Sequence, residues 1–245
     1  MHEERTYRNL ICDSRFKTFN VIVQQTDLLV HAKEDLKDIA RDLVIEQRGY
    51  LEAFIRRYPE FFTTLRPWSH AGIAPGIVAD MLWAGKLSAV GPMAAVAGAL
   101  AERIGLGLLA KTDEIIVENG GDIFIKTNVP VTIGIFAGKS PLSLKFGFTV
   151  DSRDKPLGVC TSSGSIGHSL SLGNADSVCV MSASCSLADA AATSVGNLVR
   201  SKSDVQAAIE YGKSIDGVRA VVIIASDELG LWGDLELLPL SSIIS

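Results

Sequence analysis

Several features that mark common classes of protein are absent from this sequence. Lys and Arg are scattered and the net charge of the 245 residues is −5, so the sequence lacks the basic stripe that nucleic-acid binding needs. The longest nearly apolar run, residues 87–101, contains Gly and Pro and is shorter than the roughly 20 residues that span a membrane. We therefore expect neither nucleic acid nor a membrane as a partner.

Cysteine is scarce, and no motif uses it. The sequence has no CxxC pair and no zinc-type spacing among Cys12, Cys160, Cys179 and Cys185. The first ten residues, MHEERTYRNL, lack the apolar core and the cleavage site of a signal peptide. We expect reduced, buried cysteines, which behave as small apolar residues, and a cytosolic location. No GxSxG elbow surrounds the serines, so a hydrolase triad has little support.

The periodicity of apolar residues indicates the fold class. Apolar residues make up 47% of the chain, enough for a sizeable core. Helical spacing recurs in residues 33–57, 76–87, 92–105, 187–199 and 204–214, and strand-like runs lie before, between and after these segments. Residues 160–177 fit neither pattern. With no repeat and no linker, we expect one compact α+β domain over residues 1–245, a mostly antiparallel sheet with helices packed on it.

The segment Asn119-Gly120-Gly121-Asp122 lies between two apolar runs and has two interpretations. Asn-Gly at such a place is a strong signal for a hairpin turn, because both residues tolerate positive φ. Glycine also removes Cβ, which lets backbone N–H groups approach a phosphate or a polar ring. The two interpretations are compatible with each other.

Asp189 and Thr193 are four residues apart and share one face if residues 187–199 form a helix. A carboxylate and a hydroxyl on one face suit a hard cation such as Mg²⁺, which takes oxygen ligands. The alternative is structural: Ser186 and Asp189 fit a capping box at the start of the helix, and Thr193 then bonds back to its own helix.

The sequence leaves the role of two further segments undecided. His168 lies in the Gly- and Ser-rich segment TSSGSIGHSLSLG, where it is either a general base or a surface residue. The small-residue segment AVGPMAAVAGALAE, residues 89–102, is either a buried helix packed closely against its neighbours or a helix start that faces an anion.

Taken in order, these motifs resemble the ApbE superfamily, the flavin transferases in which FAD supplies FMN to a protein hydroxyl. The shared parts are ENGGDI and ADAAATS. The string VGPMAAVAGALAE points more closely to the ApbE-related branch called UPF0280. The resemblance implies an ApbE-like fold, related to the T-fold, with FAD or a related nucleotide and Mg²⁺ as ligands.

The resemblance also implies a role for particular residues. Asp189 and Thr193 correspond to the Mg²⁺ ligands, and a backbone carbonyl from residues 95–98 completes the protein ligands. The flavin nucleotide site corresponds to Asn119, Gly120, Gly121 and Asp122, with Ser163 and Gly164 at its border. His168 and Asp189 then take part in metal-assisted phosphoryl transfer, with His168 or a nearby carboxylate accepting the proton of the attacking hydroxyl.

The sequence departs from the flavin transferases at two places. His168 is followed by Ser-Leu-Ser-Leu-Gly, where those enzymes have an Asp-Pro and a Thr-Gly. The small-residue segment has Val96-Ala97-Gly98 where those enzymes have Ala-Lys-Gly. A nucleotide pocket is therefore better supported than flavin transfer.

Two other functions remain open on the same scaffold. Cys185 precedes Ser186 at the expected helix start, where a thiolate is favoured, so an enzyme or accessory factor of sulfur or amino-acid metabolism that uses a thiol is an alternative. A non-catalytic, ligand-binding homo-oligomer, for example a homodimer formed through the small-residue helices, is the other.

Overall fold

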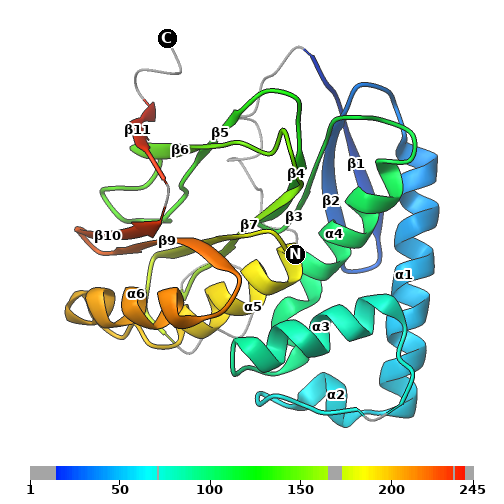
Figure 1. Cartoon of the computed structure of the whole chain (residues 1–245), viewed down its shortest axis with the longest axis horizontal. Helices are drawn as coiled ribbons and strands as arrows, with labels where there is room; N and C mark the ends of the chain where they lie inside the picture. Colours follow the sequence, from blue (N-terminus) through cyan, green and yellow to red (C-terminus); the bar gives the residue numbers. More distant parts are fainter. Residues whose placement is uncertain (1–14, 71, 165–172, 234, 241–245) are drawn as a thin grey trace.

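The fold is α+β, as the sequence predicts. The computed structural model describes residues 15–70, 72–164, 173–233 and 235–240. An eight-stranded sheet has the order β1-β2-β3-β4-β7-β8-β9-β10, and a three-stranded sheet has the order β11-β6-β5 (Figure 1). Every pair of neighbouring strands is antiparallel.

The large sheet is built largely from strands that follow one another in sequence. Its strands are β1 (Lys17–Val23), β2 (Thr26–Ala32), β3 (Ile115–Asn119), β4 (Asp122–Lys126), β7 (Leu157–Ser162), β8 (Ser177–Ser182), β9 (Val218–Ala225) and β10 (Glu228–Gly233).

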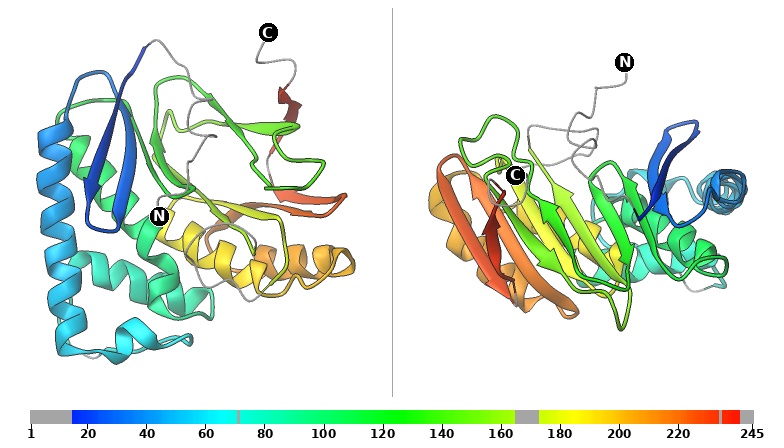
Figure 2. Two further views of the ribbon diagram at one scale, coloured as in Figure 1. Left: turned by 180° about the vertical axis from the view of Figure 1, so that it is seen from behind. Right: turned by 90° about the horizontal axis from the view of Figure 1, so that it is seen from above.

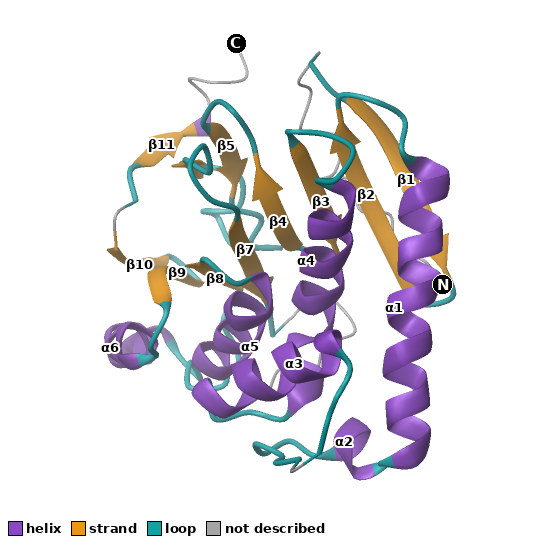
Figure 3. Ribbon diagram, turned by 45° about the vertical axis from the view of Figure 1, so that its right-hand side comes forward, coloured by secondary structure: helices purple, strands orange, loops and turns teal. Residues whose placement is uncertain are grey.

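Helices cover one face of this sheet and bury the larger of two apolar cores against it (Figure 3). They are α1 (Lys37–Arg57), α2 (Glu60–Thr63), α3 (Gly76–Leu87), η2 (Pro92–Ala95), α4 (Val96–Leu108), α5 (Cys185–Gly196), η3 (Lys202–Asp204) and α6 (Val205–Ser214). The long helix α1 lies beside β1 at one end of the sheet, and α6 lies beside β9 and β10 at the other (Figure 2). Helices α3, α4 and α5 occupy the middle.

The small sheet buries a second core on the opposite face. Its strands are β5 (Val131–Gly134), β6 (Phe146–Val150) and β11 (Leu237–Pro239). Side chains of β4 alternate between the cores, because successive residues of a strand point to opposite faces: Phe124 belongs to the helix-side core, whereas Ile123 and Ile125 belong to the second core.

The sequence predicts α3 with its observed bounds, and it predicts one helix where η2 and α4 follow each other. It does not predict α2, β7 or β10. The expectation that residues 160–177 have no regular structure is wrong at its ends, because residues 160–162 belong to β7 and residue 177 begins β8.

No one helix in the described part of the chain has both the length and the apolar character to cross a membrane. α3 and the η2–α4 segment meet that criterion only when they are taken as a pair, and the pair is bent by 108°.

Two glycines in helices make a matched test of the packing between α4 and the sheet. A Cβ at Gly105 would collide with the ring of Phe124, whereas a Cβ at Gly49 of α1 would meet nothing within 4 Å. Gly105→Ala should lower the free energy of unfolding by about 1–3 kcal/mol through overpacking. Gly49→Ala should raise it by roughly 0.5–1 kcal/mol. Urea unfolding measures both, and equal effects at the two positions would contradict the packing described.

Candidate functional site

The Asn119–Asp122 segment is a hairpin turn between β3 and β4. Asn119 pairs with Asp122 across the hairpin. The turn residues Gly120 and Gly121 have φ of 70° and 104°, a region that disfavours side chains. The Gly121 N–H donates to Oε1 of Glu118 at 2.7 Å. The predicted hairpin is confirmed, although the positive φ values belong to the two glycines and not to Asn119.

The hairpin contacts the start of helix α4, and the start of α4 contacts α5. Nδ2 of Asn119 donates to the carbonyl oxygen of Ala97 at 3.0 Å. The next N–H along the chain, that of Gly98, donates to Oδ2 of Asp189 at 2.8 Å. Three segments far apart in sequence therefore converge on the helix-covered face of the sheet.

Gly98 permits this close approach of α4 and α5. A Cβ at Gly98 would overlap the carbonyl oxygen of Cys185 and lie 2.8 Å from Cβ of Asp189. A larger residue would push α5 away from the first turn of α4. The small residues that the sequence places at 95–98 thus bring the Asp189 carboxylate to the N-terminus of α4.

The capping box predicted for Ser186 and Asp189 is wrong. Helix α5 begins two residues earlier, and its N-cap is Ser184, whose side chain accepts from the N–H of Leu187. Asp189 lies in the second turn, so its carboxylate is beyond the reach of its own helix start. It accepts instead from an early N–H of α4, whose own N-cap, Ala95, offers no side-chain acceptor.

Helix α4 caps α5 in return. Oε2 of Glu102 accepts from the N–H of Ser186 at 3.0 Å and from its hydroxyl at 2.9 Å. It also accepts from the hydroxyl of Ser184 at 3.1 Å. Because each carboxylate satisfies N–H groups that a helix start leaves unpaired, Glu102 and Asp189 fix the two helices to each other. No motif of the sequence singles out Glu102, although a Glu within a run of small apolar residues is a usable signal.

Asp122 and Asp189 have strongly perturbed pKa values. Burial raises the pKa of Asp122 well above its usual value and the negative charge of Asp189 raises it further, while hydrogen bonds from the Cys160 thiol and the Thr161 N–H act against this. Burial raises the pKa of Asp189 to about 7 despite the backbone hydrogen bonds from Gly98 and Ala97. The negative charge of Glu118 also raises the pKa of Asp122.

The side-chain oxygens of Asp122, Asp189 and Thr193 suit a hard cation. Asp122 is 7% exposed, and its Oδ1 is buried with no hydrogen-bond partner in the described part of the chain. Thr193, one turn after Asp189, is 9% exposed. A buried carboxylate oxygen without a partner is costly unless a proton or a cation reaches it, so the residues present fit the cation that the resemblance implies.

A soft metal fits less well. Within the described ranges, no three His, Cys, Asp or Glu side chains are grouped so that they could hold a metal by themselves. A cation here would rely on hydroxyl, carbonyl, water or ligand oxygens beside the carboxylates, the ligands that Mg²⁺ and Mn²⁺ take.

The remaining predicted residues lie in the hairpin or directly after the strand β7 beside it, with one outside the described structure. Gly121 lies beside Thr161, in β7, and Ser163 and Gly164 directly follow that strand. The Gly164 N–H donates to the carbonyl of Ala175 at 3.0 Å. Gly120 and Gly164 are exposed and Ser163 is partly exposed, so this rim is made of small residues. His168 lies outside the described residues.

The expectation of reduced, buried cysteines is confirmed for Cys160, Cys179 and Cys185, against the alternative of a thiolate at Cys185. The Sγ atoms of Cys160 and Cys185 lie 3.5 Å apart, and both residues are fully buried. Burial raises the pKa of the Cys185 thiol to about 11 and that of Cys179 to about 12. It also raises the pKa of Cys160 well above the usual value. Burial therefore outweighs the helix start at Cys185, and the thiol reading loses its support. Cys12 lies outside the described residues.

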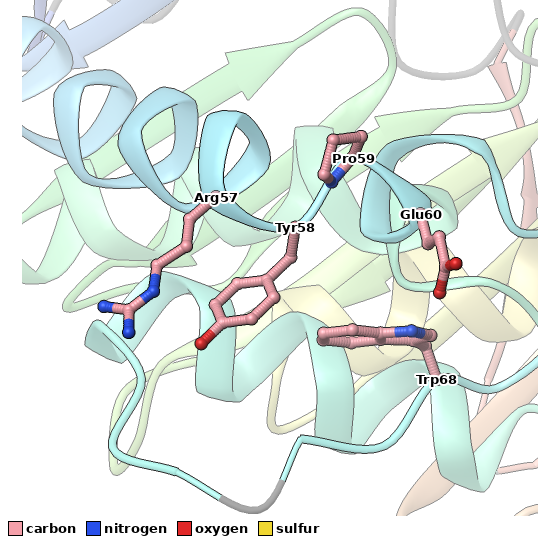
Figure 4. A pocket seen from close by; sticks show the side chains of 5 residues that line it. All are labelled: Arg57, Tyr58, Pro59, Glu60 and Trp68. Carbon is pink, nitrogen blue, oxygen red and sulfur yellow. The ribbon is translucent and has the colours of Figure 1, made fainter.

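Two surface hollows lie away from this cluster. One of about 290 Å³ follows the end of α1 and is lined by Arg57, Tyr58, Pro59, Glu60 and Trp68 (Figure 4). Its aromatic rings pack on one another, and Trp68 stacks on His70 at 5.8 Å. The other, about 400 Å³, lies between α6 and β10. Neither is lined by a predicted site residue.

Comparisons with known proteins show the family of the chain. The family model described as AbpE bacteria matches residues 8–231. A UPF0280 protein of Methanococcus aeolicus is 37% identical over 221 residues, which cover 88% of this chain and 89% of that protein. A UPF0280 protein of Methanocella arvoryzae is 39% identical over 220 residues, which cover 89% of each.

Solved structures match in fold. A mutant of the flavin transferase ApbE from Vibrio cholerae has a TM-score of 0.57 at 11% identity, covering 89% of this chain and 97% of that one. The apo form of the Pseudomonas stutzeri flavinyl transferase ApbE has a TM-score of 0.55 at 12% identity, covering 90% and 96%. The chain therefore has an ApbE-like fold.

The raised carboxyl pKa values predict how stability depends on pH. Between the ordinary aspartate pKa of about 4 and the raised values, the folded state binds more protons than the unfolded state. The free energy of unfolding should therefore fall as the pH rises from about 4 to about 7, by on the order of 1 kcal/mol per pH unit. Asp122→Asn should flatten this dependence, because it removes one of the two facing charges.

Urea unfolding in EDTA at several pH values makes the measurement. Asp151→Asn is the control. Hydrogen bonds from Arg153 lower the pKa of Asp151 to about 2. The stability that Asp151 contributes therefore increases as the pH rises, and it does so at lower pH. An unchanged pH dependence in Asp122→Asn would contradict the perturbed pair.

Proposed function

The chain belongs to the family described as AbpE bacteria, with the UPF0280 proteins as relatives, and from this membership we propose that it binds a flavin nucleotide, FAD, together with a divalent cation. The site lies where the β3–β4 hairpin meets the starts of α4 and α5. The observation that carries the proposal is this convergence, together with the unpartnered Oδ1 of Asp122.

Asp189 and Thr193 hold the cation in this proposal. A carboxylate accepts from several partners at once, so the hydrogen bond from Gly98 leaves capacity on Asp189 for a cation. The Thr193 hydroxyl follows one turn later on the same face of α5. The cation itself and the partial positive charge of the N-terminus of α4 both favour an anionic ligand at this site.

The nucleotide lies against the small-residue rim. Gly120, Gly121 and Gly164 have no side chain to exclude a ligand, and Ser163 adds a hydroxyl. Asn119 is held by the carbonyl of Ala97, which fixes the hairpin relative to α4. A rigid hairpin of this kind keeps its backbone groups in position before the ligand arrives, which lowers the entropic cost of binding.

A bound Mg²⁺ neutralises the pyrophosphate of FAD and stabilises the charge on AMP if FMN is transferred. Transfer itself is the less supported part, because the residues after His168 and at Val96-Ala97-Gly98 depart from the flavin transferases. Nucleotide binding is the function proposed; FMN transfer to a hydroxyl, with His168 as its base, remains a prediction from the resemblance. The cytosolic location and the homodimer also remain predictions.

Thermal unfolding followed by circular dichroism tests the proposal. FAD at about 100 times its Kd, with Mg²⁺, should stabilise the fold by about 2.7 kcal/mol and raise Tm by about 5–10 °C. Asp189→Asn should abolish the part of the shift that requires Mg²⁺. Glu102→Gln is the matched control, because it alters the reciprocal helix cap and leaves the proposed cation ligands in place.

Two outcomes would count against the proposal. If millimolar FAD with Mg²⁺ leaves Tm unchanged, the chain does not bind this nucleotide. If Asp189→Asn keeps the full Mg²⁺-dependent shift, Asp189 serves only as an acceptor for the start of α4.

A further inference from the structure

Asp122 occupies a position that strand alternation assigns to the helix-side core. Phe124, two residues later on the same face of β4, packs against α4 at Gly105. A charged side chain at such a position is rare unless it is paired. Asp122 is nevertheless 7% exposed, and its Oδ1 has no hydrogen-bond partner among the described residues.

The charges around Asp122 make its isolation worse. Asp189 of α5 and Glu118 of β3 both act on it, and both are acidic. A buried pair of carboxylates is neutralised by a proton, by a basic side chain or by a cation. The charged neighbours that affect the pKa of Asp122 include no basic one, which leaves a proton or a cation.

We propose that Asp122 is itself a ligand of the divalent cation, so that Asp122 of the hairpin and Asp189 of α5 hold the ion from two sides. This rests on the proposed function for the place of the cation and adds a ligand to it. Thr193 and a carbonyl near the start of α4 are the neutral oxygens available, and water or phosphate completes the shell.

The chemistry of the neighbours selects the kind of ion. The Cys160 thiol beside Asp122 donates to the carbonyl oxygen of Cys185 at 3.3 Å, so it is already engaged with α5. Two carboxylates with neutral oxygens suit Mg²⁺ or Mn²⁺. The two carboxylates can bind the cation without any help from phosphate by releasing the proton that burial makes them hold, so the proposal expects the cation to bind before the nucleotide.

Titration with Mn²⁺ alone, followed by the electron paramagnetic resonance signal of the free ion, tests this on the full chain. The wild type should bind Mn²⁺ without nucleotide. Asp122→Asn should weaken binding by at least about tenfold, the scale on which residues around a metal site act. Glu118→Gln is the matched control: alternation places Glu118 on the opposite face of the hairpin, and Gln keeps an acceptor for the Gly121 N–H. It should change the Kd less than about threefold, because Glu118 faces the other side of the sheet and supplies no ligand oxygen in this proposal.

A measurement on the wild type covers the case in which Asp122→Asn does not fold. Mn²⁺ broadens the NMR signals of nearby amides, so the Gly121 and Gly98 amides should lose intensity before that of Gly49 on α1. Broadening that spares Gly121 and Gly98 would overturn the proposal. So would equal weakening by Asp122→Asn and Glu118→Gln, which would mean that Asp122 acts through charge alone.

The outcomes separate this inference from the proposed function. If Mn²⁺ binds only when FAD is present, the nucleotide site stands and the two-carboxylate cation site falls. If Mn²⁺ binds through Asp122 and FAD has no effect on Tm, the cation site stands and the flavin proposal falls.

Discussion

The contact between the first turns of α4 and α5 is the constraint on which the rest of the site depends. Gly98 allows the two helices to approach, and the carboxylates of Asp189 and Glu102 each satisfy N–H groups at the start of the other helix. This arrangement brings a carboxylate that belongs to α5 to the point where the hairpin meets α4. The same bond from Gly98 that stabilises the helix pair therefore also fixes the carboxylate on which the proposed cation site depends.

The local patterns of the sequence predict much of the fold. Asn-Gly between apolar runs predicts the β3–β4 hairpin, and apolar spacing predicts α3 with its observed bounds. The strand β7 escapes prediction because its helix-facing residues, Gly158 and Cys160, are small; α5 packs directly on Gly158. Such a requirement comes from tertiary packing, and the sequence of the strand alone does not contain it.

Some residues of the candidate site could be selected from the sequence, whereas the contacts between them could not. Spacing and resemblance select Asp189, Thr193 and the hairpin. The bond from Gly98 to Asp189 joins residues 91 positions apart, so spacing suggested a capping box where the structure has a cap between helices. The missing partner of Asp122 is likewise invisible in sequence, because only the packed structure shows which of its oxygens is buried. The departures after His168 and at Val96-Ala97-Gly98 concern the groups that would serve an acceptor, whereas the motifs of the proposed nucleotide site are present.

A crystal structure of the protein grown with Mn²⁺ and FAD would test the central claim most directly, because anomalous scattering locates manganese without reference to the protein. The account predicts an anomalous peak between the carboxylates of Asp122 and Asp189, with the nucleotide's phosphates beside it and the flavin along Gly120 and Gly121. A peak elsewhere, or a nucleotide bound away from the β3–β4 hairpin, would contradict it.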